Sequence, residues 1–124
     1  MRKAHPTLTP HELAIMKVVW RLEEATVRDV YEALRAKREI AYTTVMTMMK
    51  ILETKKHLKK TQDDRAHVYR PSKPKDQVLG GMVREFVNRV FNGSAEPLLM
   101  HLIEDSNLTP KELDELTRTI RRLK

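Results

Sequence analysis

The sequence predicts a mainly helical fold with a small β-hairpin, arranged as a winged helix-turn-helix followed by a three-helix region. Two observations predict it. Apolar residues recur at helical spacing along most of the 124-residue chain. The stretch from Ile40 to Pro71 departs from this pattern, because it contains a threonine-rich helix, a basic strand, a charged turn and a second strand, in that order.

Positive charge is concentrated in the same stretch. The formal net charge of the chain is +7, and residues 41–75 alone carry +6, from nine basic and three acidic residues. The basic residues are Lys50, Lys55, Lys56, Lys59, Lys60, Arg65, Arg70, Lys73 and Lys75. Charge spread evenly would only aid solubility, whereas a concentrated patch indicates a polyanionic partner.

Three predicted helix starts share one pattern. Thr9, Thr26 and Thr109 each precede an acidic residue by three positions. The hydroxyl caps a free backbone N–H, and the carboxylate favours the positive end of the helix. The string LTPxEL occurs at residues 8–13 and 108–113, but the flanking sequences diverge and no fixed period recurs. We therefore interpret it as one start used twice, not as a repeat architecture.

The first half of the chain predicts three helices, over residues 10–22, 27–36 and 42–56. The third has a poorly capped start, because Ala41 offers no side-chain acceptor. The residues expected to face the core are Leu13, Ile15, Met16, Val18, Val19, Trp20, Val30, Tyr31, Leu34, Val45, Met48, Met49 and Leu52.

Two strands follow these helices. They are expected over His57–Gln62 and Ala66–Arg70, with Leu58 and Val68 facing inward and a charged turn between them. The prolines at 71 and 74 then interrupt regular structure. We place a boundary there, with a winged-helix domain over residues 1–74 and a second, helical domain over residues 75–124.

The second domain is expected to contain helices over residues 76–91, 97–104 and 110–123, with a stop at Asn92-Gly93 and Ser94 available as a cap. About fifty residues in three helices are too few to bury their own apolar surface, so two copies should share one core. Gly80-Gly81 marks a hinge, a close helix approach or a late helix start. The predicted dimerisation residues are Val83, Phe86, Val90, Phe91, Leu98, Leu99, Leu102, Ile103, Leu113, Leu116 and Ile120.

The outer side of the 42–56 helix is suited to reading DNA. Threonine can bond a phosphate or place its methyl against thymine, and Lys50 can reach a guanine or a phosphate. The candidate residues are Tyr42, Thr43, Thr44, Met46, Thr47 and Lys50. The alternative is an ordinary solvated helix, but threonine is a mediocre helix former, which favours a binding role.

The hairpin supplies the candidate phosphate contacts Lys59, Lys60, Arg65 and His67. Arg65 at the tip is suited to a minor groove. Asp63 and Asp64 repel phosphate and should point away from it or orient Arg65. An ordinary solvated turn is the alternative.

Several classes of function are not expected. The chain has no cysteine, which excludes disulfides and thiolate chemistry, and its five histidines lack the spacing of a metal site. No nucleophile triad or glycine-rich phosphate loop occurs, so we expect neither an enzyme nor a cofactor. No apolar run approaches the ~20 residues of a membrane span, and MRKAHPTLTP is not a secretory signal. We expect a cytoplasmic protein.

These observations predict a homodimer that binds double-stranded DNA. A winged helix that docks on a protein without specific DNA binding is the alternative, and the concentrated charge argues against it. RNA binding would need interleaved aromatic residues to stack bases, which the sequence lacks.

The chain resembles the penicillinase-repressor (BlaI/MecI/CopY) family of bacterial transcription regulators nearly end to end. The resemblance rests on Leu8-Thr9 with the helix ending at Val19-Trp20, on AYTTVMTMMKIL at 41–52, on Asp64–Tyr69, and on Phe91–Ser94. It implies a winged-helix DNA-binding domain over residues 1–74 and a helical dimerisation domain over residues 75–124. It also implies that the homodimer binds a palindromic double-stranded DNA operator and represses genes for β-lactam resistance or a related stress response.

The resemblance also implies a mode of release. Family members are often freed from DNA when a membrane-bound metallopeptidase sensor leads to their cleavage in the dimerisation region. Aligning Gly93-Ser94 with the Gly-Ser of the family puts that position at His101-Leu102, where this chain lacks the Asn-Phe of familiar members. The cysteines of the copper-responsive branch are also missing.

Overall fold

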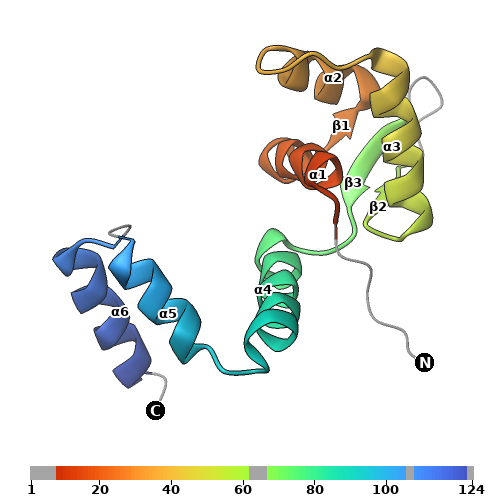
Figure 1. Ribbon diagram of the computed structural model, residues 1–124. Helices are drawn as coiled ribbons and strands as arrows, with labels where there is room; N and C mark the ends of the chain where they lie inside the picture. Colours follow the sequence, from red (N-terminus) through yellow and green to blue (C-terminus); the bar gives the residue numbers. More distant parts are fainter. Residues whose placement is uncertain (1–7, 62–66, 106–107, 123–124) are drawn as a thin grey trace. The chain divides into compact units, whose positions relative to one another are not determined.

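A computed structural model describes residues 8–61, 67–105 and 108–122. This part of the chain is mainly helical with one small antiparallel sheet, as predicted (Figure 1). The elements in order are α1 (Pro10–Leu22), β1 (Ala25–Thr26), α2 (Val27–Arg35), α3 (Tyr42–Thr54), β2 (Leu58–Lys60), β3 (Val68–Pro71), α4 (Lys75–Phe91), α5 (Glu96–Glu104) and α6 (Pro110–Arg122).

The chain divides into two compact units, Met1–Gly80 and Gly81–Lys124. Because α4 begins at Lys75 and ends at Phe91, it contributes to both. Gly80 and Gly81 lie inside α4 at the division, so the late helix start considered from the sequence is wrong.

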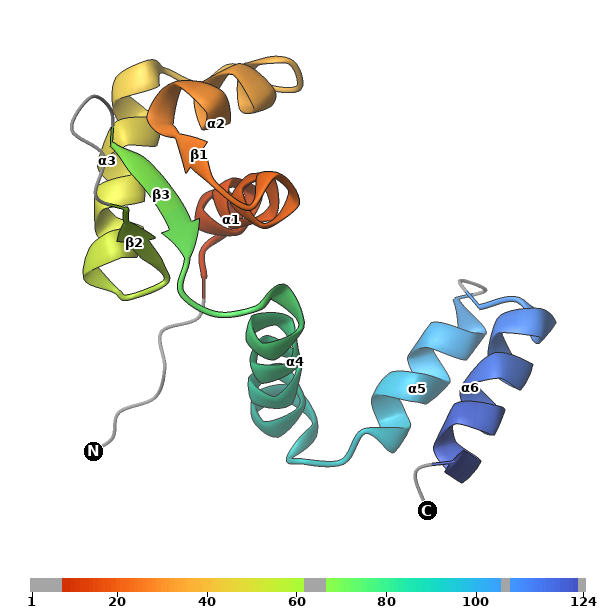
Figure 2. The same ribbon diagram turned by 180° about the vertical axis from the view of Figure 1, so that it is seen from behind.

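The first unit packs α1, α2 and α3 around a three-stranded sheet in the order β1-β3-β2 (Figure 2). The sequence predicted two strands and missed β1, which is two residues long and pairs through Ala25 with Tyr69 and through Thr26 with Val68. The side chains that form its core are Leu8, Ile15, Met16, Val18, Val19, Ala25, Val27, Val30, Leu34, Val45, Met49, Leu52, Leu58 and Tyr69. Leu13, Trp20, Tyr31, Met48 and Val68 were expected inside and are half-buried.

The predicted threonine caps are confirmed. Thr9, Thr26 and Thr109 each accept a hydrogen bond from the backbone N–H three residues later, and the acid at that position accepts one in return from the threonine N–H. Two orphan donors are thereby satisfied at each start. The start of α3 at Ala41 has no side-chain cap, also as predicted.

One capping carboxylate has a second role. Glu12 is 4% exposed, and its carboxylate oxygens accept hydrogen bonds of 3.2 and 3.0 Å from the Lys55 ammonium, which follows α3. Burial alone would raise the pKa of Glu12, but the Thr9 backbone hydrogen bond and the Lys55 ammonium bring that pKa below 4.5. The pair therefore joins the start of α1 to the end of α3.

Helix and strand ends differ from the prediction by at most two residues, for local reasons. Helix α3 stops at Thr54, two residues early, because Lys56 has a positive φ of 69°. Asn92 and Gly93 end α4 as predicted, with φ values of 54° and 88°. Ser94 does not cap α5, because that helix begins one residue earlier than expected and its N-cap is Ala95.

The second unit contains the C-terminal part of α4 with α5 and α6. Val87 is its one buried side chain among residues 81–105 and 108–122. Phe91 stacks edge-on with Phe86 at 5.9 Å between ring centroids and lies 6.2 Å from the ring of His101. Helices α5 and α6 bury no side chain at all within the described residues.

Candidate nucleic-acid interface

Helix α3 has a sealed inner side and an open outer side. Val45, Met49 and Leu52 are fully buried and fix the helix against the core. The six candidate groove-reading residues, Tyr42, Thr43, Thr44, Met46, Thr47 and Lys50, are all exposed on it. Thr43, Thr44 and Thr47, together with the half-buried Met48, line a shallow depression of about 240 Å³. The short threonine side chains allow a binding partner to come close to the α3 backbone over about two helical turns.

Beside the start of α3 lies a stack that the sequence did not reveal. The guanidinium of Arg28 lies 5.1 Å from the ring centroid of Tyr42, and Tyr42 meets Tyr31 edge-on at 5.5 Å. Arg35 lies 5.7 Å from the Tyr31 ring. Glu32 pairs with both arginines, at 3.6 and 3.5 Å, but these side chains are about half exposed or more, so the pairs are weak.

Tyr42 has a contact that the sequence did not predict. Its ring is a platform that holds Arg28 next to the groove-reading residues, through a cation–π contact. Arg28 is an exposed cation at the first turn of α2, beside an α3 start without a side-chain cap. Such a combination favours a phosphate group. The periodicity of α2 marks Arg28 as outward-facing, but its contact with Tyr42 depends on the packing of α2 against α3.

The two lysines of β2 face opposite sides of the sheet. Lys60 pairs in register with the buried Tyr69, lies 5.9 Å from its ring centroid, and reaches the Glu53 carboxylate on α3 at 3.9 Å. Burial, followed by the Glu53 charge, raises the pKa of Tyr69. Lys60 is thus on the α3 side of the hairpin, and any phosphate must compete with Glu53 for it.

Lys59 pairs in register with Arg70 and belongs to a different group. Side chains alternate across a strand, so Lys59 lies on the face opposite Lys60. There it lines a hollow with Lys17, Arg21 and Arg70. The structure therefore separates Lys59 from the other candidate DNA contacts.

The remaining hairpin candidates are at its outer end. His67 is exposed immediately before β3, and the Thr61 N–H donates to the Val68 carbonyl at 2.8 Å, which closes the strand pair beside it. Arg65 lies outside the described residues, as do Asp63 and Asp64.

The predicted dimerisation residues form an uncovered apolar surface in the second unit. Eight of the eleven are more than a third exposed, namely Val83, Phe86, Val90, Leu99, Leu102, Ile103, Leu116 and Ile120. Phe91, Leu98 and Leu113 are half-buried. His101 and Leu102, at the candidate cleavage position, are both exposed within α5.

Within residues 8–61, 67–105 and 108–122, no three His, Asp or Glu side chains come together in a way that could hold a metal ion. None of the helices formed by these residues is long and apolar enough to cross a membrane.

Comparison with known sequences finds regulators of one kind. A family model described as Penicillinase repressor matches residues 8–122. The Transcriptional regulator BlaI of Mycobacterium tuberculosis (strain H37Rv) is 40% identical over 114 residues, which cover 90% of this chain and 81% of that protein. The Penicillinase repressor of Bacillus licheniformis is 26% identical over 114 residues, or 92% and 89% of the two chains.

Comparison with solved structures finds the Bacillus licheniformis BlaI monomeric form in complex with the blaP half-operator. The TM-score is 0.51 at 27% sequence identity, and the match covers 60% of this chain and 92% of that chain. The relative was solved with DNA, and its similarity extends to fold as well as sequence.

Proposed function

The chain belongs to the penicillinase repressor family, whose named members are transcriptional regulators and not enzymes, and we propose that it acts as a homodimeric repressor that binds a palindromic DNA operator. The observation that carries the proposal is the outer side of α3, where six exposed residues, three of them threonines, lie beside exposed cations. A relative bound to a half-operator supports the same role for this chain.

In this proposal α3 enters the major groove. Thr43, Thr47 and Lys50 recur at one-turn intervals, so they line one stripe of the helix and meet successive base edges. Threonine methyl groups suit thymine, and the Lys50 ammonium suits the acceptor edge of guanine. Sequence discrimination is therefore assigned to α3.

Phosphate contacts flank the groove on both sides of α3. Arg28, held over Tyr42, serves one strand, and Lys60, His67 and Arg65 of the hairpin serve the other. These contacts fix the register of the protein but carry no sequence information directly. Each neutralised phosphate makes binding more sensitive to salt.

Dimerisation is assigned to the apolar surface of the second unit. Helices α5 and α6 have no buried side chain among the residues described, and their leucine and isoleucine side chains stay in contact with water. A second copy of the chain would cover that surface and present two α3 helices to two half-sites about one duplex turn, or a small multiple of a turn, apart.

Release is assigned to the same unit, because separating the subunits removes the gain from binding two half-sites at once. His101 and Leu102 are exposed on α5, so a peptidase could reach them after local unwinding of the helix. A membrane-bound sensor with metallopeptidase activity is the proposed partner. Incubation of the purified chain with such a peptidase, followed by mass spectrometry, should detect cleavage between His101 and Leu102. A chain that stays intact would contradict release by proteolysis at this position.

The function is tested by selection from a pool of random-sequence duplexes. The full chain should enrich a motif with twofold symmetry, and fluorescence anisotropy should show weaker binding to a scrambled duplex of the same composition. Thr47→Ala and Lys50→Ala should each lose about 1–3 kcal/mol of that discrimination. Enrichment of no motif, with equal binding to motif and scrambled duplexes, would favour a protein-docking winged helix.

A further inference from the structure

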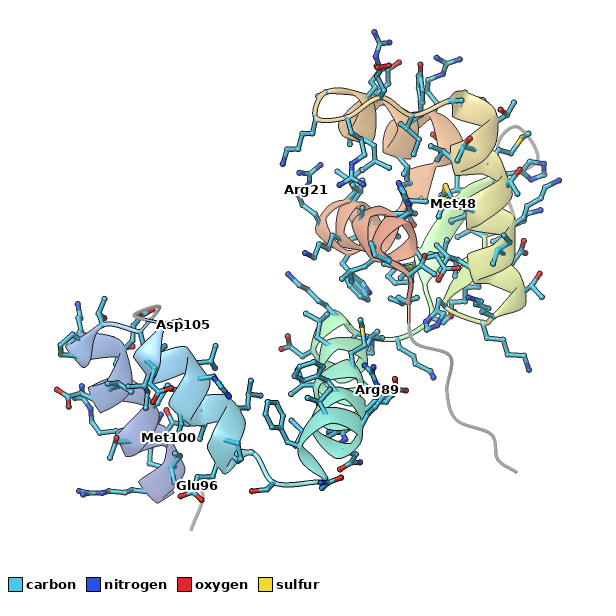
Figure 3. The ribbon with its side chains drawn as sticks, in the orientation of Figure 1. Arg21, Met48, Arg89, Glu96, Met100 and Asp105 are labelled. Atoms are coloured by element: carbon cyan, nitrogen blue, oxygen red, sulfur yellow. The ribbon has the colours of Figure 1, made fainter. Side chains whose placement is uncertain are left out.

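The first unit contains a basic hollow that the proposed DNA interface does not use. It has a volume of about 680 Å³ and lies between the C-terminal half of α1, the outer face of β2 and β3, and the segment that leads into α4. Five basic side chains line it: Lys17, Arg21, Lys59, Arg70 and Lys75. Arg21 projects from α1 in Figure 3 and is exposed.

The charges of this hollow are poorly balanced. Glu23 is the one acidic residue in its lining, against five basic ones. Within the described part of the chain, Arg70 alone of the five has an ion-pair partner, Glu24 at 3.5 Å, and both side chains are 54% exposed. Like charges gathered from two helices and two strands repel one another, so an anion bound between them would be strongly favoured.

The same hollow has an apolar part. Trp20, Pro71 and Pro74 line it together with the cations. The Trp20 indole N–H donates to the Lys73 carbonyl at 3.2 Å, which ties the end of α1 to the linker and fixes the edge of the ring. A wall of this kind suits a flat apolar group beside the charged part of a ligand.

We propose that this hollow is a binding site for a small ligand that carries two or more negative groups, phosphate or carboxylate, next to a flat apolar part. The cations bind the negative groups, and Trp20 with the two prolines covers the apolar part. The ligand would touch both the linker and Lys75, the first residue of α4. The site does not depend on the proposed DNA interface, since Lys59 and Lys60 face opposite sides of the sheet.

Trp20 is the sole tryptophan of the chain, so its fluorescence reports on this site alone. The full-length protein would be titrated with pyrophosphate, with tricarballylate and with phenyl phosphate, at constant ionic strength set by potassium chloride. We expect a saturable change in Trp20 emission with pyrophosphate or tricarballylate, whichever chemistry the site prefers. Phenyl phosphate should bind more tightly than inorganic phosphate, because of its ring.

A matched pair of double variants separates the site from general electrostatics. Lys17→Gln with Lys75→Gln should weaken binding about tenfold or more, since two of five cations are removed. Lys56→Gln with Lys111→Gln removes the same charge outside the hollow and should leave binding within about twofold. Circular dichroism of both would verify that the fold is retained.

Two results would overturn the proposal. One is a fluorescence response that never saturates, or that the two double variants lose equally. The other is displacement of pyrophosphate by a random-sequence duplex, with both ligands weakened alike by Lys17→Gln and Lys75→Gln, which would reassign the hollow to nucleic acid. Neither result depends on whether the chain selects an operator, so this proposal and the proposed function fail separately.

Discussion

Glu12 contributes both to a helix cap and to a tertiary ion pair. It completes the capping box of α1 and also pairs with Lys55; the Glu12 side chain is buried, at 5% exposure, and the Lys55 side chain is half-buried, at 28%. Asp29 occupies the same place in the capping box of α2 but is exposed. The two acids have the same local role, and they differ in burial and in the tertiary ion pair.

Glu12→Gln should therefore destabilise the protein more than Asp29→Asn does. At neutral pH the loss in unfolding free energy should be about 1–3 kcal/mol for Glu12→Gln, because the half-buried Lys55 ammonium loses its charged partner, and below about 1 kcal/mol for Asp29→Asn. Urea denaturation measures both. Equal losses would mean that the ion pair adds nothing to the cap.

The Glu12 contribution should also depend on pH in a defined direction. Because the folded state lowers the pKa of Glu12 below its ordinary 4.5, the stabilisation is fully present above pH 4.5 and is lost as pH falls through the lowered value. The difference between the wild type and Glu12→Gln should therefore shrink in acid. Urea titrations repeated from neutral pH to well below pH 4.5 test this; a constant difference would contradict it.

Arg28 is the second residue with a testable role. Arg28→Gln should weaken binding to all duplexes and lower the salt dependence by about one unit, as expected for one phosphate contact. Tyr42→Phe keeps the platform and should change little, whereas Tyr42→Leu should resemble Arg28→Gln. Anisotropy at several salt concentrations measures these slopes. An unchanged slope for Arg28→Gln would remove it from the interface.

Helix α4 contains two adjacent glycines, Gly80 and Gly81, in its interior, where glycine is usually unfavourable. A Cβ added to Gly81 would meet Arg84 Nη2 at 3.9 Å, an ordinary contact, so close packing within this chain does not require glycine there. The division between the two compact units falls between Gly80 and Gly81. Of the readings considered from the sequence, a hinge fits these two facts best.

Gly81→Ala should stabilise α4 by about 0.5–1 kcal/mol, because alanine restricts the unfolded chain and favours the helix. If Gly81 is part of a hinge, alanine should stiffen it. The dimer should then bind operators over a narrower range of half-site spacings. Anisotropy with duplexes of stepped spacing measures that range, with the exposed helical substitution Asn88→Ala as a control. An equally broad range in Gly81→Ala would contradict the hinge.

The sequence predicted elements whose signals are local. Helix positions, the three threonine caps and the exposed side of α3 follow from spacing and cap chemistry alone, and the fold class and family were predicted correctly. The missed features depend on distant partners. Strand β1 forms because Ala25 and Thr26 pair with β3. The Arg28–Tyr42 contact forms because α2 packs against α3. Strand alternation could have separated Lys59 from Lys60, and that signal was overlooked.

For the molecule as a whole, the decisive question is what covers the apolar surface of the second unit. Ile103→Asp should place a charge in the proposed subunit interface and give a monomer, which loses operator affinity by 10²-fold or more through the loss of paired half-sites. Thr117→Asp adds the same charge to α6 and should remain dimeric. Sedimentation equilibrium measures the mass of each; a dimeric Ile103→Asp protein would move the interface elsewhere.

The pairing of β2 with β3 has one more consequence. A shift of β2 by a single residue against β3 would turn β2 over relative to its partner, exchanging which lysine approaches Glu53 and which approaches Arg70. The same shift would carry the buried Leu58 side chain to the outer face of the sheet. Burial of Leu58 therefore fixes the register and, through it, keeps the two groups of cations on separate surfaces.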